Sequence, residues 1–163
     1  MKTFAGLRVH EIVQTYSDTL IRIAVQQTKN MSEAEDIVQE VYMTLMRQKK
    51  PFDNEAHLKA WLIKVTFNKC NDYFKSSRVK KTVPITEEMT FIAKEEQSVL
   101  PEIFELDQKE RAIVYLHYYE GYTTAEIADL LEMKINTVGS KLRRVRMKLK
   151  IILEEGNKCD ECL

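Results

Sequence analysis

The residue types best suited to binding a charged partner lie near the C-terminus of the chain. Residues 136–150 contain six lysines and arginines and no carboxylate. Such cations bind nucleic-acid phosphates, and small polar side chains at the start of the same helix can reach base edges. The cations are Lys141, Arg143, Arg144, Arg146, Lys148 and Lys150, preceded by Asn136, Thr137, Gly139 and Ser140. The segment therefore predicts a DNA-reading helix.

Two helices joined by a tight turn are expected to position these side chains. Thr123 and Glu126 have the spacing of a capping box, which predicts the start of the first helix. Its buried stripe is expected at Ile127, Leu130 and Leu131. The second helix carries its apolar residues within one narrow arc, so it can dock while the cations stay outside. These apolar residues are Val138, Leu142, Val145 and Leu149. The pattern predicts a helix-turn-helix unit.

A solvated basic helix on an ordinary helical domain is the alternative interpretation, because charge runs usually are solvated faces. A merely soluble helix surface normally mixes both signs, so that pairs form between neighbouring turns. The absence of Asp and Glu from this helix favours contact with phosphates instead.

Length and composition predict a helical protein. The chain has 163 residues, 44% of them hydrophobic, with only four glycines and three prolines, which suits one good core or two small ones. The net charge is zero, but Ser32 to Glu40 is acidic, so two partners of different character are plausible. No run approaches the roughly 20 apolar residues of a membrane span, and the N-terminus lacks the apolar core of a signal peptide. We therefore expect a cytoplasmic protein without direct membrane insertion.

The rest of the chain predicts an all-α fold of two small helical domains joined by a linker. Helical periodicity runs from Leu7 to Lys29, a capping box of Ser32 and Glu35 predicts a second helix that ends by Pro51, and a third is expected from about Ala56 to Phe74. The expected domains are residues 1–76 and 98–155, with a flexible linker at 77–97 and a cysteine-containing tail at 156–163.

The second predicted helix has two distinct faces. Ile37, Val41 and Leu45 share an inward face. The outward face carries Asp36, Gln39, Glu40 and Met43. A solvated polar face is the simplest explanation of that outward side.

With these motifs in this order, the chain resembles a bacterial extracytoplasmic-function (ECF) sigma factor, a small promoter-recognition subunit of RNA polymerase. Ser32 to Met46, SEAEDIVQEVYMTLM, is similar to the family's polymerase-clamp-binding helix. His57 to Phe74 resembles the helix and loop that melt and read the minus-ten element. Phe104 to Arg146 resembles the reader of the minus-thirty-five element. The resemblance covers nearly the whole chain.

The resemblance implies roles for particular residues. Asp36, Gln39 and Glu40 match positions that dock on the clamp, and Met43 shares their face. Asn68 matches the asparagine that holds an extruded base of the minus-ten element, because an amide can both donate and accept along a base edge. Lys69, Asn71, Asp72 and Lys75 would line the same surface. Contacts to the minus-thirty-five element are implied for Asn136, Thr137, Ser140, Lys141, Arg143 and Arg144.

The resemblance also implies partners. They are core RNA polymerase, through its clamp and flap surfaces, promoter DNA, and an anti-sigma factor that holds the protein inactive. No small-molecule substrate, cofactor or metal is expected, and no enzymatic activity. The chain has no phosphate-binding glycine loop and no metal-spaced cluster, and its histidines, His10, His57 and His117, are scattered.

Three features depart from the family pattern. Gly139 stands where many members have a larger basic or polar residue, and Asp107 where the family often has proline. Cys159 and Cys162 in the tail have C-x-x-C spacing, which suits half a zinc site, a disulfide or an oxidant sensor, although a frayed terminus explains the tail as simply. Cys70 is expected to be a small buried or half-buried thiol with no chemical role.

Two other classes of protein remain open at this point. A stand-alone dimeric helix-turn-helix regulator would bind a palindrome unaided, but would have no use for the features around Asp36 and Asn68. A redox- or metal-responsive interaction protein would depend on Cys159 and Cys162.

Overall fold

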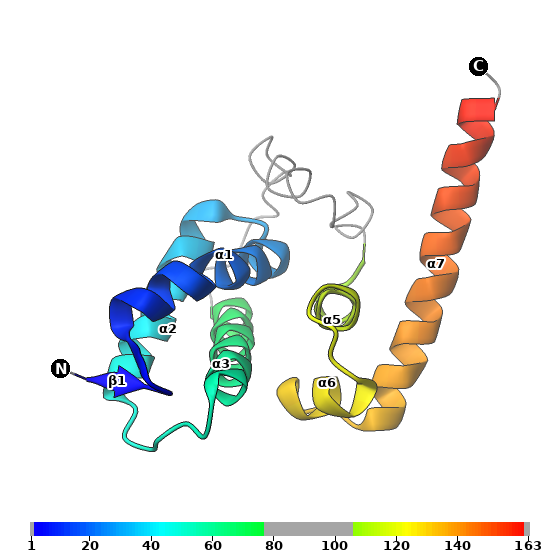
Figure 1. Ribbon diagram of the computed structural model, residues 1–163. Coiled ribbons are helices and arrows are strands. Elements are labelled where there is room, and N and C mark those ends of the chain that lie inside the picture. Colours follow the sequence, from blue (N-terminus) through cyan, green and yellow to red (C-terminus); the bar gives the residue numbers. More distant parts are fainter. Residues whose placement is uncertain (1, 77–105, 162–163) are drawn as a thin grey trace. The chain divides into compact units, whose positions relative to one another are not determined.

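The chain forms two compact units, Met1–Ile92 and Ala93–Leu163 (Figure 1). The computed structural model describes residues 2–76 and 106–161, with side chains as far as Lys150. Within these ranges every regular element is a helix, apart from one pair of two-residue strands. The predicted all-α fold is confirmed. The linker predicted at 77–97 lies outside the described residues.

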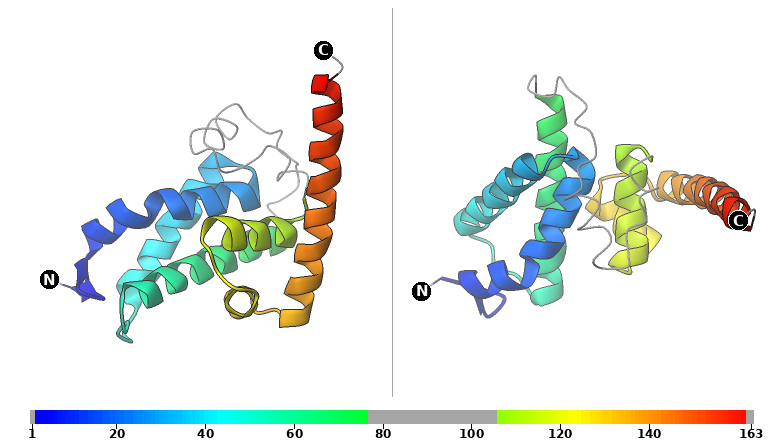
Figure 2. Two further views of the ribbon diagram at one scale, coloured as in Figure 1. Left: turned by 45° about the vertical axis from the view of Figure 1, so that its right-hand side comes forward. Right: turned by 90° about the horizontal axis from the view of Figure 1, so that it is seen from above.

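The first unit is a bundle of three helices, α1 (Val9–Thr28), α2 (Met31–Arg47) and α3 (Glu55–Lys75). Helix α1 packs against both α2 and α3, and these two also pack against each other; Figure 2 shows the same three helices side by side in two further views. Each helix contributes fully buried aliphatic side chains to the core: Ile12, Leu20, Ile23, Val41, Leu45, Leu58, Leu62 and Ile63. Burial of each such side chain contributes about 1.5–3 kcal/mol. The inward face predicted for the second helix is therefore confirmed.

Asparagines begin the two long helices that follow α1. Asn30 precedes α2 in an extended conformation, and its Oδ1 accepts a hydrogen bond from the Glu33 amide at 3.2 Å. The predicted capping box of Ser32 and Glu35 is wrong, because Ser32 already lies inside the helix. Asn54 caps α3 in the same way, accepting from the His57 amide at 2.8 Å.

A small β-hairpin precedes α1, where sequence periodicity predicted the helix to begin at Leu7. Strands β1 (Thr3–Phe4) and β2 (Leu7–Arg8) pair antiparallel. Ala5 and Gly6 between them have φ values of 51° and 83°, the left-handed conformation that two-residue hairpin turns require. Strands this short leave no alternating pattern in the sequence.

The second unit contains α5 (Gln108–Val114), the π-helix η2 (Tyr115–Tyr119), α6 (Thr124–Leu130) and α7 (Ile135–Glu161). Helix α7 packs against both α5 and α6. Leu106, Val114 and Val145 form a core cluster on which Tyr119 and Leu149 pack. The predicted buried arc of α7 is confirmed at Val138, Leu142 and Val145, with Leu149 half-buried. The backbone of α7 stays helical to Glu161, so it continues into the predicted tail.

Candidate nucleic-acid and partner-binding surfaces

Helices α6 and α7 form the predicted helix-turn-helix. The Thr123 hydroxyl oxygen accepts from the Glu126 amide at 3.2 Å and so caps α6. In a capping box the Glu126 carboxylate would accept from the Thr123 backbone amide. Here it accepts from the Thr123 hydroxyl at 3.1 Å instead. Glu132 adopts a left-handed conformation in the turn, and the Met133 amide donates to the Ala128 carbonyl at 2.9 Å. This turn ends α6 and begins α7 within a few residues.

The six residues predicted to contact the minus-thirty-five element lie on α7 away from its buried arc or at its flanks. Asn136, Ser140, Arg143 and Arg144 are exposed, and Thr137 and Lys141 are half-buried. Gly139 lies among them, and a Cβ atom built there would meet nothing within 4 Å. Packing within the described residues therefore gives no reason for a glycine at this position.

Two of the cations counted as phosphate ligands bind other side chains of the same unit. Lys148 Nζ lies 2.9 and 3.1 Å from the two carboxylate oxygens of Glu110, whose side chain is only 4% exposed. Arg146 Nε donates to the Tyr118 hydroxyl at 2.7 Å. Both cations link α7 to the α5–η2 segment. Glu110 balances the charge of Lys148, so the count of six cations overstates the charge offered to DNA, whereas Arg146 keeps its charge because a tyrosine hydroxyl is neutral.

The partner of Lys148 also explains Asp107, a departure from the family pattern. Asp107 caps α5: its Oδ1 accepts from the Glu110 amide at 2.8 Å, and Glu110 Oε2 accepts from the Asp107 amide at 3.3 Å. This capping box holds the Glu110 carboxylate inside the unit, where an unpaired charge would be strongly unfavourable. Lys148 supplies the compensating charge.

The outward face of α2 has the predicted composition. Asp36, Gln39 and Glu40 are exposed, and Met43 is 55% exposed. Met46, one turn on, is 47% exposed. Exposed methionines beside carboxylates suit a protein partner that combines apolar and basic groups.

The residues predicted to read the minus-ten element lie in α3 itself, and Asn68 lies inside this helix rather than on a loop. At about 100° per residue, Asn68, Asn71 and Lys75 fall within an arc of about 60°. Lys69 and Asp72 turn toward α2, where Lys69 Nζ lies 3.7 Å from Glu40 Oε2. Together with Tyr73 and Ser76, they line a groove between the two helices. The structure thus divides the five predicted residues between two adjoining faces.

Aromatic side chains of α3 mostly serve the fold. Phe67 is buried, and Tyr73 and Phe74 are half-buried and pack edge to face at 5.4 Å. Trp61 is half-buried, with its ring 5.5 Å from that of Phe52. A core role is clearest for Phe67, which is 4% exposed.

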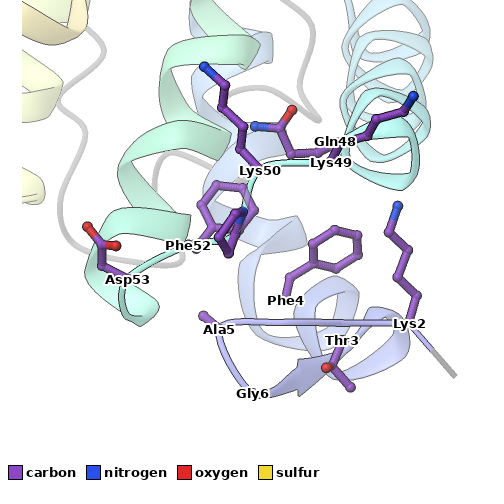
Figure 3. Close-up of a pocket in the computed structure, with 11 residues that line it drawn as sticks. Lys2, Thr3, Phe4, Ala5, Gly6, Gln48, Lys49, Lys50, Phe52 and Asp53 are labelled. Atoms are coloured by element: carbon purple, nitrogen blue, oxygen red, sulfur yellow. The ribbon is translucent and has the colours of Figure 1, made fainter.

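Sequence reasoning missed a basic pocket where the N-terminal hairpin meets the α2–α3 loop (Figure 3). Lys2, Lys49 and Lys50 are exposed on its rim, and Lys2 Nζ donates to the Met46 carbonyl at 2.6 Å. Phe52 is buried below them, 6.2 Å from the ring of Phe4. The two adjacent lysines before Pro51 were a visible signal, but the third comes from the unpredicted hairpin.

The described residues give little support to a reactive or metal-binding cysteine. Cys70 is buried, which confirms the predicted burial. Burial raises the pKa of its thiol to about 12, which disfavours the reactive thiolate. Among the residues whose side chains are described, no group of three His, Cys, Asp or Glu could hold a metal ion. The side chains of Cys159 and Cys162 lie outside the described residues.

No described helix is long and apolar enough to cross a bilayer.

Each of the two units matches the model of a known protein family. Residues 12–79 match the model for sigma-70 region 2, and residues 103–149 match the model for sigma-70 region 4. The first match spans most of the α1–α3 bundle and the second spans the helix-turn-helix unit, so the chain belongs to the sigma-70 family.

Similar proteins of known type indicate which group of the sigma-70 family the chain belongs to. The ECF RNA polymerase sigma factor SigW of Bacillus subtilis is 26% identical over 163 aligned residues, covering 86% of each chain. SigL of Mycobacterium tuberculosis, also an ECF sigma factor, is 28% identical over 154 residues, covering 86% of this chain and 85% of SigL. The fold is similar to that of the sigma factor RpoE in its complex with the anti-sigma factor NepR from Bartonella quintana, with a TM-score of 0.66, 16% identity and coverage of 89% and 96%. The chain is a member of the ECF group.

Proposed function

We propose that the protein binds core RNA polymerase and directs it to promoters, with α2 docking on the polymerase, α3 reading the minus-ten element and α7 reading the minus-thirty-five element. The observation that carries this proposal is the polar face of α7. It has exposed cations and small polar side chains, no carboxylate up to Lys150, and a helix-turn-helix that positions it.

Each surface fits its proposed partner by charge and chemistry. The face of α2 made by Asp36, Gln39, Glu40 and Met43 would receive a basic helical element of the polymerase clamp. On α3, Asn68 would hydrogen-bond an unstacked base, with Asn71 and Lys75 beside it. On α7 the contacts would come from Asn136, Thr137, Ser140, Lys141, Arg143 and Arg144, with the basic side chains binding phosphates.

Attachment of both units to one chain would let two modest affinities reinforce each other. Once α2 holds the polymerase, the second binding event becomes intramolecular, and its effective concentration is set by the connection between the units. The chemistry of RNA synthesis would belong to the polymerase. We propose no catalytic residue, no cofactor and a cytoplasmic location for the chain itself.

An anti-sigma factor is the proposed regulator. The similar fold of RpoE is seen in complex with the anti-sigma factor NepR. A partner of this kind would keep the protein inactive by covering the surfaces of α2 and α7 that polymerase and DNA need.

Separation of polymerase binding from promoter opening tests the assignment. Asn68→Ala should leave the affinity for core polymerase unchanged and reduce the formation of open complexes at saturating protein. Gel-filtration of the mixture measures the first, and fluorescence of a base analogue in the minus-ten element measures the second. Weakened polymerase binding by this variant would contradict the role given to Asn68.

A further inference from the structure

The groove between α2 and α3 carries an excess of negative charge. Helix α2 contributes Glu33, Asp36 and Glu40, and α3 contributes Asp72. Lys69 is the one cation among the lining residues. Ile37, which is 5% exposed, adds an apolar side chain to the lining. Four carboxylates against one ammonium make this groove unfavourable for a phosphate backbone and favourable for a basic partner.

Contacts within the groove join its two walls. The 3.7 Å approach of Lys69 Nζ to Glu40 Oε2 pairs the only lining cation with a carboxylate of α2. Tyr73 lies close enough to Glu33 for that charge to act on it: burial raises the pKa of the Tyr73 hydroxyl, and the negative charge of Glu33 raises it further. The hydroxyl therefore stays neutral and able to donate a hydrogen bond.

Helix geometry separates this wall from the side of α3 that carries Asn68. Lys69, Asp72, Tyr73 and Ser76 fall within an arc of about 100°, centred about 120° from the centre of the arc formed by Asn68, Asn71 and Lys75. The second arc is free of carboxylates and ends in a cation. The two sides of α3 thus differ in charge.

We infer that the α3 wall of this groove, which includes Asp72, is part of the surface that binds core RNA polymerase, with a basic helix of the polymerase lying between α2 and α3. The polymerase-binding surface then extends beyond α2 and includes residues that sequence similarity assigned to DNA. Charge complementarity selects the occupant, because lysines or arginines would meet carboxylates on both walls. This inference rests on the proposed function and adds a second helix to its docking site.

Two neighbouring substitutions with the same change in net charge test it. Asp72→Asn removes a negative charge from the groove, and Asn71→Lys adds a positive charge on the other side of α3. The affinity of the full-length protein for core polymerase is measured by fluorescence anisotropy at two salt concentrations. Asp72→Asn should weaken binding about two- to fivefold and reduce its salt dependence, whereas Asn71→Lys should leave it unchanged. Asp72→Ser provides a second removal of the charge, and thermal unfolding of each variant verifies its fold.

Open-complex formation at saturating protein separates the two possible roles of Asp72. We expect Asp72→Asn to open promoters as the wild type does once polymerase is saturated. Unchanged polymerase affinity, or an opening defect like that of Asn68→Ala, would overturn the inference and return Asp72 to the DNA surface. Failure of the wild-type protein to bind core polymerase would instead overturn the proposed function and the inference with it.

Discussion

Substitution of Lys148 by methionine should destabilise the second unit, because it leaves the Glu110 carboxylate without its cation. Breaking a fully buried ion pair costs about 3–5 kcal/mol. Here the Glu110 side chain is 4% exposed but that of Lys148 is 52% exposed, so water already screens one side of the pair. The hydrogen bond from the Asp107 amide to Glu110 also remains. We therefore expect a loss of about 1–2 kcal/mol in the free energy of unfolding.

Thermal unfolding followed by circular dichroism and calorimetry measures this loss. For a domain of this size, each kcal/mol lowers Tm by about 4–8 °C. Arg143→Met is the matched control, since it removes an exposed cation from the same helix without disturbing Glu110. Its Tm should stay within about 2–4 °C of the wild type, because exposed substitutions change stability by no more than about 0.5 kcal/mol.

A second pair of variants isolates the charge on Glu110. Glu110→Gln keeps the shape of the side chain and removes the charge, so Lys148→Met should cost less in that background than in the wild type. The difference is the coupling energy between the two residues. Equal losses in both backgrounds, or no loss in either, would refute the view that Lys148 compensates a buried carboxylate.

Three further predictions follow from single residues. Gly139→Ala should stabilise α7 by about 0.5–1 kcal/mol, because its methyl group meets nothing within 4 Å; a lower Tm would show that something other than helix propensity governs this position. Arg144→Ala should reduce the slope of log K against log salt for minus-thirty-five DNA by about 0.9 if it binds a phosphate, and a loss confined to certain sequences would identify a base contact instead. Cys70 should resist a thiol reagent at pH 8 in the native protein and react on unfolding. Burial raises the pKa of its thiol to about 12, and the thiolate forms only as the pH approaches that value. Rapid labelling of the native protein would contradict its burial.

Periodic patterns in the sequence were enough to predict the long helices and their buried faces. Ile37, Val41 and Leu45 recur at helical spacing and are buried, as are Val138, Leu142 and Val145. Apolar periodicity works here because each helix must bury one stripe to be stable. The starts of helices were less predictable, since Asn30 and Ser32 can both cap a helix and the backbone conformation at Asn30 decided between them.

Features that depend on contacts between distant residues were not predictable. The pairing of Lys148 with Glu110 joins residues 38 positions apart, so local sequence showed only a basic helix. The turn of Lys69 and Asp72 toward α2 likewise depends on how α2 and α3 pack. The hairpin was missed because two-residue strands carry no periodic signal. Similarity located the candidate site residues, and packing showed which surface each of them faces.

Run-off transcription by core RNA polymerase on a genomic promoter library, with and without the protein, tests the central claim most directly. The proposed function predicts specific starts that appear only with the protein and share two upstream elements, at the minus-ten and minus-thirty-five positions. Absence of such starts, together with binding of the protein alone to palindromic DNA, would contradict it and favour a stand-alone regulator.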